Sequence, residues 1–184
     1  GGSFAGALAA LRERPGAAPG ILGDLRAHTG IHDAMPRGFE LVRLDFDLVC
    51  SASCFAQLKR HRIATVIPGA YDPGLGITIP PHVRQAGAAD VLLEFAGTAD
   101  DLYRRIAADV GPEHGAYALT NAHRRRVLFS CHLRELIHLS RLRVDAHAQW
   151  DIRALASEMC RQAAEAMPAA GAFLAGKDGW SATA

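Results

Sequence analysis

Three consecutive basic residues, Arg60, His61 and Arg62, form the sharpest candidate site in the chain. The residues before them read as a helix and those after them as a strand, so the three side chains would diverge from one corner. Guanidinium and imidazole groups gathered in this way suit a diphosphate, because they can donate charge-assisted hydrogen bonds to its oxygens. The alternative is a basic surface turn that neutralises the negative end of the helix dipole.

A second group of basic side chains recurs at helical spacing further along the chain. Arg134, His138 and Arg141 stand at positions i, i+4 and i+7 of a predicted helix, and Arg143 lies at its end. Residues at this spacing share one helix face. Taken alone, they indicate a solvated basic stripe that pairs with neighbouring carboxylates such as Glu135, and only a nearby second site would give them a function.

The spacing of cysteine and histidine gives little support to other kinds of chemistry. Cys50, Cys54 and His61 could be read as zinc ligands, but the spacing matches no common zinc site and a fourth ligand would have to come from Cys131 or His132. The sequence also contains no nucleophile elbow, P-loop or dinucleotide-binding glycine motif. We therefore predict no metal site.

A half-buried strand and a serine-capped helix are predicted to position the first basic corner. From Glu40 to Val49 apolar residues alternate with polar ones, which is the period of a strand with one buried face. Ser51 or Ser53 can cap a helix that runs to about His61. Arg62 to Ile67 is rich in β-branched residues and reads as an extended segment.

The remaining elements predict an α/β (α+β) fold with a mixed central sheet flanked by helices. The expected elements are a short element at Asp90 to Phe95, a helix opened by a capping box at Thr98 and Asp101 and ended by Gly111-Pro112, a strand at Val127 to Ser130, a helix at His132 to Leu142, and a helix capped by Asp145 that runs to Pro168. Residues 1–38 form a poorly defined N-terminal segment with a helix at 4–13, and residues 39–184 are expected to form the domain.

The composition indicates one globular domain in the cytoplasm. The chain has 184 residues, 49% of them hydrophobic, so it can bury a substantial core. Its 20 Lys and Arg residues nearly balance 19 Asp and Glu residues, which argues against a nucleic-acid or membrane surface. The four cysteines lie in apolar or helical segments, as expected for reduced thiols, and no apolar run is long enough to span a membrane.

Two segments resemble the flavin-dependent thymidylate synthases in order and spacing. The first consists of a Phe-Glu pair at the start of a strand, then a Gln shortly before an Arg-His-Arg signature: Phe39-Glu40, Gln57 and Arg60-His61-Arg62-Ile63. In the second, the family has an Asn-x-Arg on a helix, a second Asn, a Leu-Arg pair and an Ala-Gln-Trp-Glu-Ile run. This chain has His132-Leu133-Arg134, His138 in place of the second Asn, Leu142-Arg143 and Ala148-Gln149-Trp150-Asp151-Ile152. The resemblance extends from about Phe39 to Pro168.

This resemblance implies a flavoprotein of nucleotide biosynthesis, a thymidylate synthase-like methyltransferase that assembles as a homotetramer. Arg143 would be the catalytic residue, stabilising negative charge that develops on a pyrimidine ring. NADPH would reduce the flavin, methylenetetrahydrofolate would supply the carbon, and dUMP would be the substrate. The residues expected to bind FAD are Glu40, Gln57, Arg60, His61, Arg62, Ile63, His132, Arg134 and His138.

The nucleotide-binding part of the family pattern is changed in this sequence. Pro68, Ala70 and Asp72 stand where the family has a Glu, a Ser and a phosphate-binding Arg, and a further phosphate-binding Arg falls at Ala116. The triplet at residues 124–126, all arginine, could hold an anion in another way or form a solvated basic turn. Two alternatives to a thymidylate synthase are therefore a diverged flavin enzyme acting on a different substrate and a non-catalytic flavin-binding or scaffold subunit.

Overall fold

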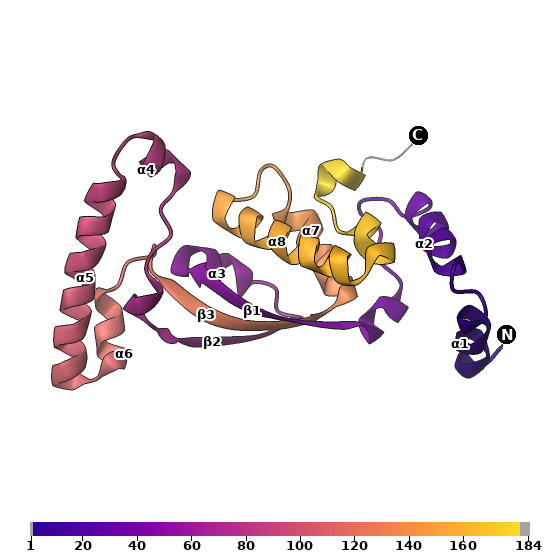
Figure 1. Ribbon diagram of the computed structural model, residues 1–184, viewed down its shortest axis with the longest axis horizontal. Helices are drawn as coiled ribbons and strands as arrows, with labels where there is room; N and C mark the ends of the chain where they lie inside the picture. Colours follow the sequence, from indigo (N-terminus) through magenta and orange to yellow (C-terminus); the bar gives the residue numbers. More distant parts are fainter. Residues whose placement is uncertain (1, 181–184) are drawn as a thin grey trace.

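A small antiparallel sheet forms the centre of the molecule in the computed structural model, which describes residues 2–180 (Figure 1). Its strands are β1 (Arg43–Ser51), β2 (Thr65–Tyr71) and β3 (Arg124–His132), in the order β1-β3-β2. The middle strand β3 pairs antiparallel with both neighbours, so that Phe129 lies opposite Phe46 on one side and Val66 on the other. The α/β class predicted from the sequence is confirmed.

One face of the sheet carries the main hydrophobic core. Phe46 and Leu48 of β1 are buried beside Val127 and Phe129 of β3, and the intervening residues point to the other face. Three helices cover the buried face: α3 (Ala52–Leu58), α7 (Leu133–Arg143) and α8 (Trp150–Ala166). The alternation predicted for the first strand is therefore correct, although its start is at Arg43 because the preceding residues form a short 3-10 turn.

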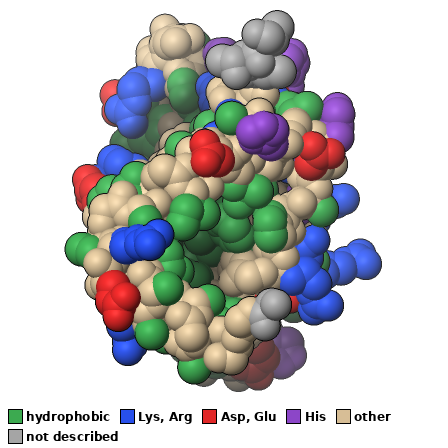
Figure 2. All heavy atoms as spheres, turned by 90° about the vertical axis from the view of Figure 1, so that its right-hand side faces the viewer, with side chains coloured by type: hydrophobic (Ala, Val, Ile, Leu, Met, Phe, Trp, Pro, Cys, Tyr) green, Lys and Arg blue, Asp and Glu red, His purple; other side chains and the backbone are tan. Residues whose placement is uncertain are grey.

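Helices also occupy the two ends of the molecule (Figure 1). At one end stand α4 (Pro81–Gln85), the long helix α5 (Ala89–Val110) and α6 (Pro112–Gly115). At the other end stand α1 (Phe4–Arg12) and α2 (Ala17–Ala27), so the segment predicted to be poorly defined contains two helices. Figure 2 views this second end and shows apolar side chains gathered around a hollow; exposed apolar residues on these two helices include Phe4, Leu8, Leu11 and Ile21.

Five 3-10 turns complete the described chain. Their bounds are η1 (Arg37–Leu41), η2 (Pro73–Leu75), η3 (Ala116–Ala118), η4 (Pro168–Phe173) and η5 (Lys177–Trp180). The last two lie against α2, where Phe173 and Trp180 are buried in a second, smaller core. The C-terminal turns thus hold α2 onto the domain.

Two predicted helix starts are wrong. Thr98 and Asp101 open no new helix, because α5 is continuous and the Thr98 hydroxyl donates to the Glu94 carbonyl one turn earlier at 3.2 Å. Asp145 does not cap the last helix, since its carboxylate accepts from the His147 backbone N–H at 2.9 Å. The cap of α8 is Gln149, whose side-chain oxygen accepts from two N–H groups of the first turn.

All four cysteines are buried as free thiols: Cys50, Cys54, Cys131 and Cys160. Residues 2–180 include no group of three His, Cys, Asp or Glu side chains that could hold a metal ion. Over the same residues, no helix combines the length and the apolar character that a membrane crossing requires.

Candidate functional site

A chain of buried polar contacts joins the Arg-His-Arg corner to α7. His61 is 4% exposed, and its Nδ1 lies 3.0 Å from an Oε1 of Glu135, which is 3% exposed. On the other side of the ring, the Nε–H of Arg143 donates to His61 Nε2 at 3.2 Å. Arg143 also donates from Nη1 to the side-chain oxygen of Gln57 at 3.0 Å. The two sequence segments that resemble the flavin-dependent enzymes therefore meet in one hydrogen-bonded unit.

The donors in this unit fix the tautomer of His61. A guanidinium can only donate, so His61 Nε2 must accept from Arg143. The ring proton then lies on Nδ1 and is donated to the carboxylate of Glu135. Both ring nitrogens of His61 are therefore engaged within the chain.

Two helix caps position these side chains. Ser51 caps α3 by accepting from the Cys54 N–H at 2.9 Å, which directs the end of that helix, with Gln57, toward α7. His132 caps α7 by accepting the Glu135 N–H at its Nδ1, also at 2.9 Å. An imidazole is an uncommon cap, and here it places the Glu135 backbone at the start of the helix with the carboxylate turned inward.

A cavity of about 680 Å³ lies beside this unit, between α7, the turn that precedes β2 and the segment that precedes η1. Its lining includes five of the residues predicted to bind FAD, and Glu135 beside them: Glu40, Ile63, His132, Arg134 and His138. Arg134 donates to Glu40 at 2.7 Å and to the Met35 carbonyl at 2.8 Å. The pKa of Glu40 is lowered, first by the hydrogen bond from Arg37 and further by Arg134.

The wall of the cavity at residues 31–35 is held by Arg141. Its Nη1 donates to the carbonyls of Ile31 at 3.1 Å and Asp33 at 2.7 Å, and its guanidinium lies 3.6 Å from the centre of the Trp180 ring. Arg26 covers the same ring at 4.0 Å. Arg141 is only 8% exposed, and burial lowers its pKa, so the stripe predicted from the sequence is not a solvated face at this position.

The other predicted site residues differ in exposure. Arg60 and Arg62 are exposed at the corner, and Ile63 is 71% exposed at the cavity rim. His138 is exposed on α7, with its ring centre 6.2 Å from that of His61. The structure therefore brings the predicted residues of both segments to one side of the molecule, with the exposed cations around the buried unit.

Sequence reasoning missed the two residues that organise this region most strongly. Glu135 was expected to pair with the basic stripe, whereas it accepts from His61, 74 positions earlier. Arg141 was counted in the stripe, whereas it anchors a loop more than a hundred positions away. A weak signal was available, because Glu135 is followed by Leu136 and Ile137 on a mostly apolar helix, where an unpaired carboxylate would be costly.

A second cavity, of about 390 Å³, lies at the opposite end of α3, and one of the changed nucleotide positions lines it. Ala116 and Tyr71 both line it, and Asp72 follows directly. The arginine triplet does not supply the missing cations, because it lies on β3 and each guanidinium has another partner. Arg124 donates to the Thr78 hydroxyl, Arg125 to the Gly69 carbonyl and Arg126 to the Asp47 carboxylate. The expected basic turn is therefore a strand.

Comparison with known proteins agrees with the residues that form the first site. The sequence profile of the family described as thymidylate synthase complementing protein matches residues 25–169. A UPF0159 protein of Chlamydia muridarum is 31% identical over 139 residues, which are 76% of this chain and 26% of that protein. A flavin-dependent thymidylate synthase of Geobacter sulfurreducens is 35% identical over 113 residues, covering 57% of this chain and 49% of that protein.

A further relative also carries the name UPF0159. A UPF0159 protein of Thermoplasma acidophilum is 27% identical over 124 residues, 67% of this chain and 25% of that protein. The chain thus spans about a quarter of these UPF0159 relatives and about half of the Geobacter protein. Since the family profile covers most of the chain, the chain belongs to the thymidylate synthase complementing protein family.

Proposed function

We propose that this chain is a flavin-dependent, thymidylate synthase-like enzyme that transfers a reduced one-carbon unit to a pyrimidine such as that of dUMP. One observation carries the proposal: Arg143 is held by His61 and Gln57 beside a cavity lined by Arg134 and His138. The sequence predicted a catalytic role for Arg143 and a role in cofactor binding for the other four residues. The names of the flavin-dependent relatives support the same chemistry.

The first cavity suits a large cofactor that combines a flat ring with anionic groups. Its volume of about 680 Å³ falls in the usual range for small-molecule and cofactor pockets. Ile63 and Leu142 offer apolar contacts, while Arg134 and Lys177 offer positive charge. In this proposal FAD is held by residues of the lining, of the exposed corner and of the buried unit beside them: Glu40, Gln57, Arg60, His61, Arg62, Ile63, His132, Arg134 and His138.

Bound FAD, once reduced by NADPH, would supply the reducing equivalents for the transfer from methylenetetrahydrofolate. The contribution of the chain would be the orientation of Arg143. With its Nε–H and one Nη1–H already committed to His61 and Gln57, the guanidinium cannot rotate, and its remaining N–H groups have a fixed direction. A preoriented cation next to a pyrimidine oxygen stabilises the charge that develops when the ring attacks the carbon donor.

We expect the chain to assemble into a homotetramer, as the resemblance implies. The helix α5 supports self-association, since Val91, Phe95 and Leu102 recur on one side of it and are 69%, 61% and 41% exposed. An apolar stripe of this kind is typical of a surface that a partner covers. Light scattering of the purified protein would give the mass of the assembly.

The proposal is tested by flavin retention and flavin reduction. We expect the purified chain to retain FAD, measured by its visible absorption, and NADPH to bleach that absorption without oxygen. Arg60→Ala and Arg134→Ala should each lower the flavin content, because each removes a cation from the corner or the cavity. Arg104→Ala is the matched control, since Arg104 is exposed on α5 and pairs with Asp101 of the same helix.

Three results would separate the alternatives. Conversion of dUMP to a methylated product by the loaded protein, lost in Arg143→Lys, supports the proposed transfer. Retained flavin that NADPH cannot reduce would identify a passive flavin-binding subunit instead. A chain that cannot be loaded with FAD at all would leave the family fold without its chemistry and overturn the proposal.

A further inference from the structure

Arg143 is held in place by two acceptors that carry no charge. Its Nε–H donates to Nε2 of His61 at 3.2 Å, and its Nη1 donates to the side-chain oxygen of Gln57 at 3.0 Å. Arg134 on the same helix is held differently, because it donates to the carboxylate of Glu40 at 2.7 Å. The direction of the Arg143 guanidinium therefore depends on neutral side chains, and one of them is an imidazole, whose nitrogens can change from acceptor to donor.

The position of a single proton decides whether His61 can hold Arg143. With the ring proton on Nδ1, the Nε2 atom accepts the hydrogen bond from Arg143. With a proton on Nε2, two N–H groups would face each other across 3.2 Å, and the guanidinium would have to turn away. The hydrogen bond made by one ring nitrogen of a histidine sets whether the other nitrogen can accept. The partner of Nδ1 therefore controls Arg143 through the ring.

Glu135 is the partner of Nδ1. Its Oε1 lies 3.0 Å from Nδ1 of His61, and the two side chains are 4% and 3% exposed, so water competes little for either group. A carboxylate accepts hydrogen bonds and cannot donate them, which requires the ring proton on Nδ1. The backbone of Glu135 is fixed as well, since its N–H donates to the capping side chain of His132 at 2.9 Å. Glu135 thus keeps His61 as an acceptor for Arg143.

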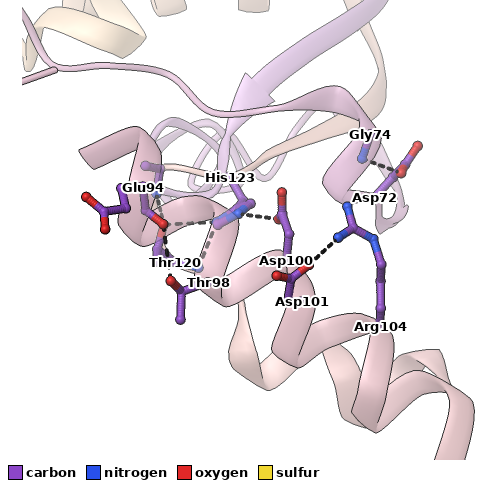
Figure 3. A network of polar contacts seen from close by, with 10 residues as sticks. Asp72, Gly74, Glu94, Thr98, Asp100, Asp101, Arg104, Thr120 and His123 are labelled. Carbon is purple, nitrogen blue, oxygen red and sulfur yellow. Dashed lines mark hydrogen bonds and ion pairs between the residues drawn. The ribbon is translucent and has the colours of Figure 1, made fainter. Parts of the chain in front are cut away.

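A second buried histidine shows the same pairing with the opposite tautomer (Figure 3). Nδ1 of His123 accepts from the Thr120 N–H at 2.9 Å, so its ring proton lies on Nε2 and is donated to Asp100 of α5, also at 2.9 Å. Both nitrogens of this ring join α5 to the segment before β3, whereas Nε2 of His61 directs an arginine. The chain therefore contains a matched pair in which a carboxylate fixes a buried histidine for a structural purpose.

Stability alone gives little reason for a carboxylate at position 135. Burying a charged pair is costly, and apolar side chains of similar size often stabilise a protein as well or better. Leu136 and Ile137, which follow Glu135 on α7, are apolar and buried. The carboxylate is better explained by the tautomer that it imposes on His61.

We propose that Glu135 is a positioning residue, which sets the direction of the Arg143 guanidinium by fixing the Nδ1 tautomer of His61. This role rests on the proposed function in that Arg143 would face the pyrimidine. A misdirected guanidinium stabilises the developing charge poorly, so loss of the tautomer should lower kcat much more than it raises KM. The hydrogen bonds themselves need neither flavin nor substrate, so the positioning can be measured apart from the chemistry.

Nuclear magnetic resonance of the flavin-free chain measures the positioning in Glu135→Ala and Glu135→Gln. In Glu135→Ala, His61 should lose its preference for the Nδ1 proton, and the Nε–H of Arg143 should exchange with water about tenfold faster, as expected for the loss of one hydrogen bond. Glu135→Gln keeps an acceptor oxygen and should retain both signals. The Arg143 signal is identified by its absence from Arg143→Lys.

Asp100→Ala is the matched control, because it removes the carboxylate from the other buried histidine. It should change the signals of His123, lower the stability measured in urea, and leave the Arg143 signal as it is in the unmodified chain.

Turnover of the flavin-loaded chain measures the functional effect. In Glu135→Ala we expect kcat to fall about 30-fold with a much smaller change in KM, because a misplaced group in an active site is costly for the chemical step. Glu135→Gln should recover at least about a third of the unmodified kcat, since its amide oxygen can accept from Nδ1. Asp100→Ala should keep its kcat once the folded fraction is taken into account. A purely structural role of Glu135 would instead give the two alanine variants the same kcat per folded chain.

The proposal is overturned if His61 of the unmodified chain carries its proton on Nε2, if Glu135→Ala keeps the Nδ1 tautomer, or if the tautomer is lost while the Arg143 signal and kcat stay unchanged. If Glu135→Ala does not fold, Glu135→Gln is decisive, since its tautomer and its Arg143 signal must be retained or lost together. A chain that turns over no pyrimidine at all would refute the proposed function, while the flavin-free signals would still decide the role of Glu135.

Discussion

Removing the carboxylate of Glu135 is the most direct test of how the buried unit holds Arg143. In Glu135→Ala, the Nδ1–H of His61 would remain buried without an acceptor. The loss of a charge-assisted hydrogen bond and the desolvated donor together should lower the free energy of unfolding by about 2–4 kcal/mol. Glu135→Gln keeps the shape and an acceptor oxygen, so its cost should be nearer to 1 kcal/mol.

Urea unfolding and nitrogen-15 NMR of the histidines measure the two parts of this prediction. The unmodified chain should show His61 protonated on Nδ1, because Arg143 occupies Nε2. In a double-mutant cycle with His61→Ala, the coupling energy should be about 1–3 kcal/mol, as expected for residues in direct contact. Additive effects of the two substitutions, or a His61 protonated on Nε2, would refute the reasoning. Glu158→Ala removes an exposed carboxylate of α8 and should change stability little.

Three further predictions concern the core and the helical end of the molecule. Burial raises the pKa of Cys131 and of Cys160 to about 12, so a thiol reagent should modify them only after unfolding, and rapid labelling of the folded chain would contradict this expectation. Because unfolded thiols ionise near 9.0, the free energy of unfolding should also fall as the pH rises from 9.0 toward 12. Gly115→Ala should destabilise the chain by about 1–3 kcal/mol in a denaturant titration, because the new Cβ would lie 2.8 Å from the Tyr103 carbonyl oxygen. Gly97→Ala should instead stabilise the chain by about 0.5–1 kcal/mol, because alanine favours a helix more than glycine does and the new Cβ on α5 would have no atom within 4 Å. A lower melting temperature of this variant would contradict the open space described around Gly97.

Local patterns predicted much of the fold because the elements that pack on the core are amphipathic. Alternation of apolar residues identified β1, and helical spacing identified α7 and α8, since each buries one face against the same core. The errors occur where the same side chain can make either of two local hydrogen bonds. Thr98 resembles a cap, but inside a helix the hydroxyl can donate to the carbonyl one turn back, and the chain gives no local sign of which use applies.

The candidate site was predictable as a set of residues and not as an arrangement. The Arg-His-Arg corner and the α7 residues were found by their spacing, yet nothing in either segment indicates that His61 is buried between Glu135 and Arg143. That arrangement depends on contacts across 74 and 82 positions, which exist only once α3 and α7 pack on the sheet. A basic residue looks the same in the sequence whether it is solvated, like Arg62 in a turn, or buried, like Arg141 on a helix.

The two cavities differ in the charges that line them. Three cations line the first cavity, those of Arg134, Arg141 and Lys177, together with three carboxylates, those of Asp33, Glu40 and Glu135, and Arg134 is already paired with Glu40. Among the lining residues of the second cavity, Glu113 carries the one charge, and Ala116 stands where the family has a phosphate-binding arginine. A lost charge-assisted hydrogen bond of this kind lowers binding by about 1.5–3 kcal/mol. Weaker binding of a phosphate does not by itself require that catalysis has been lost, because Arg143 keeps its contacts with His61 and Gln57.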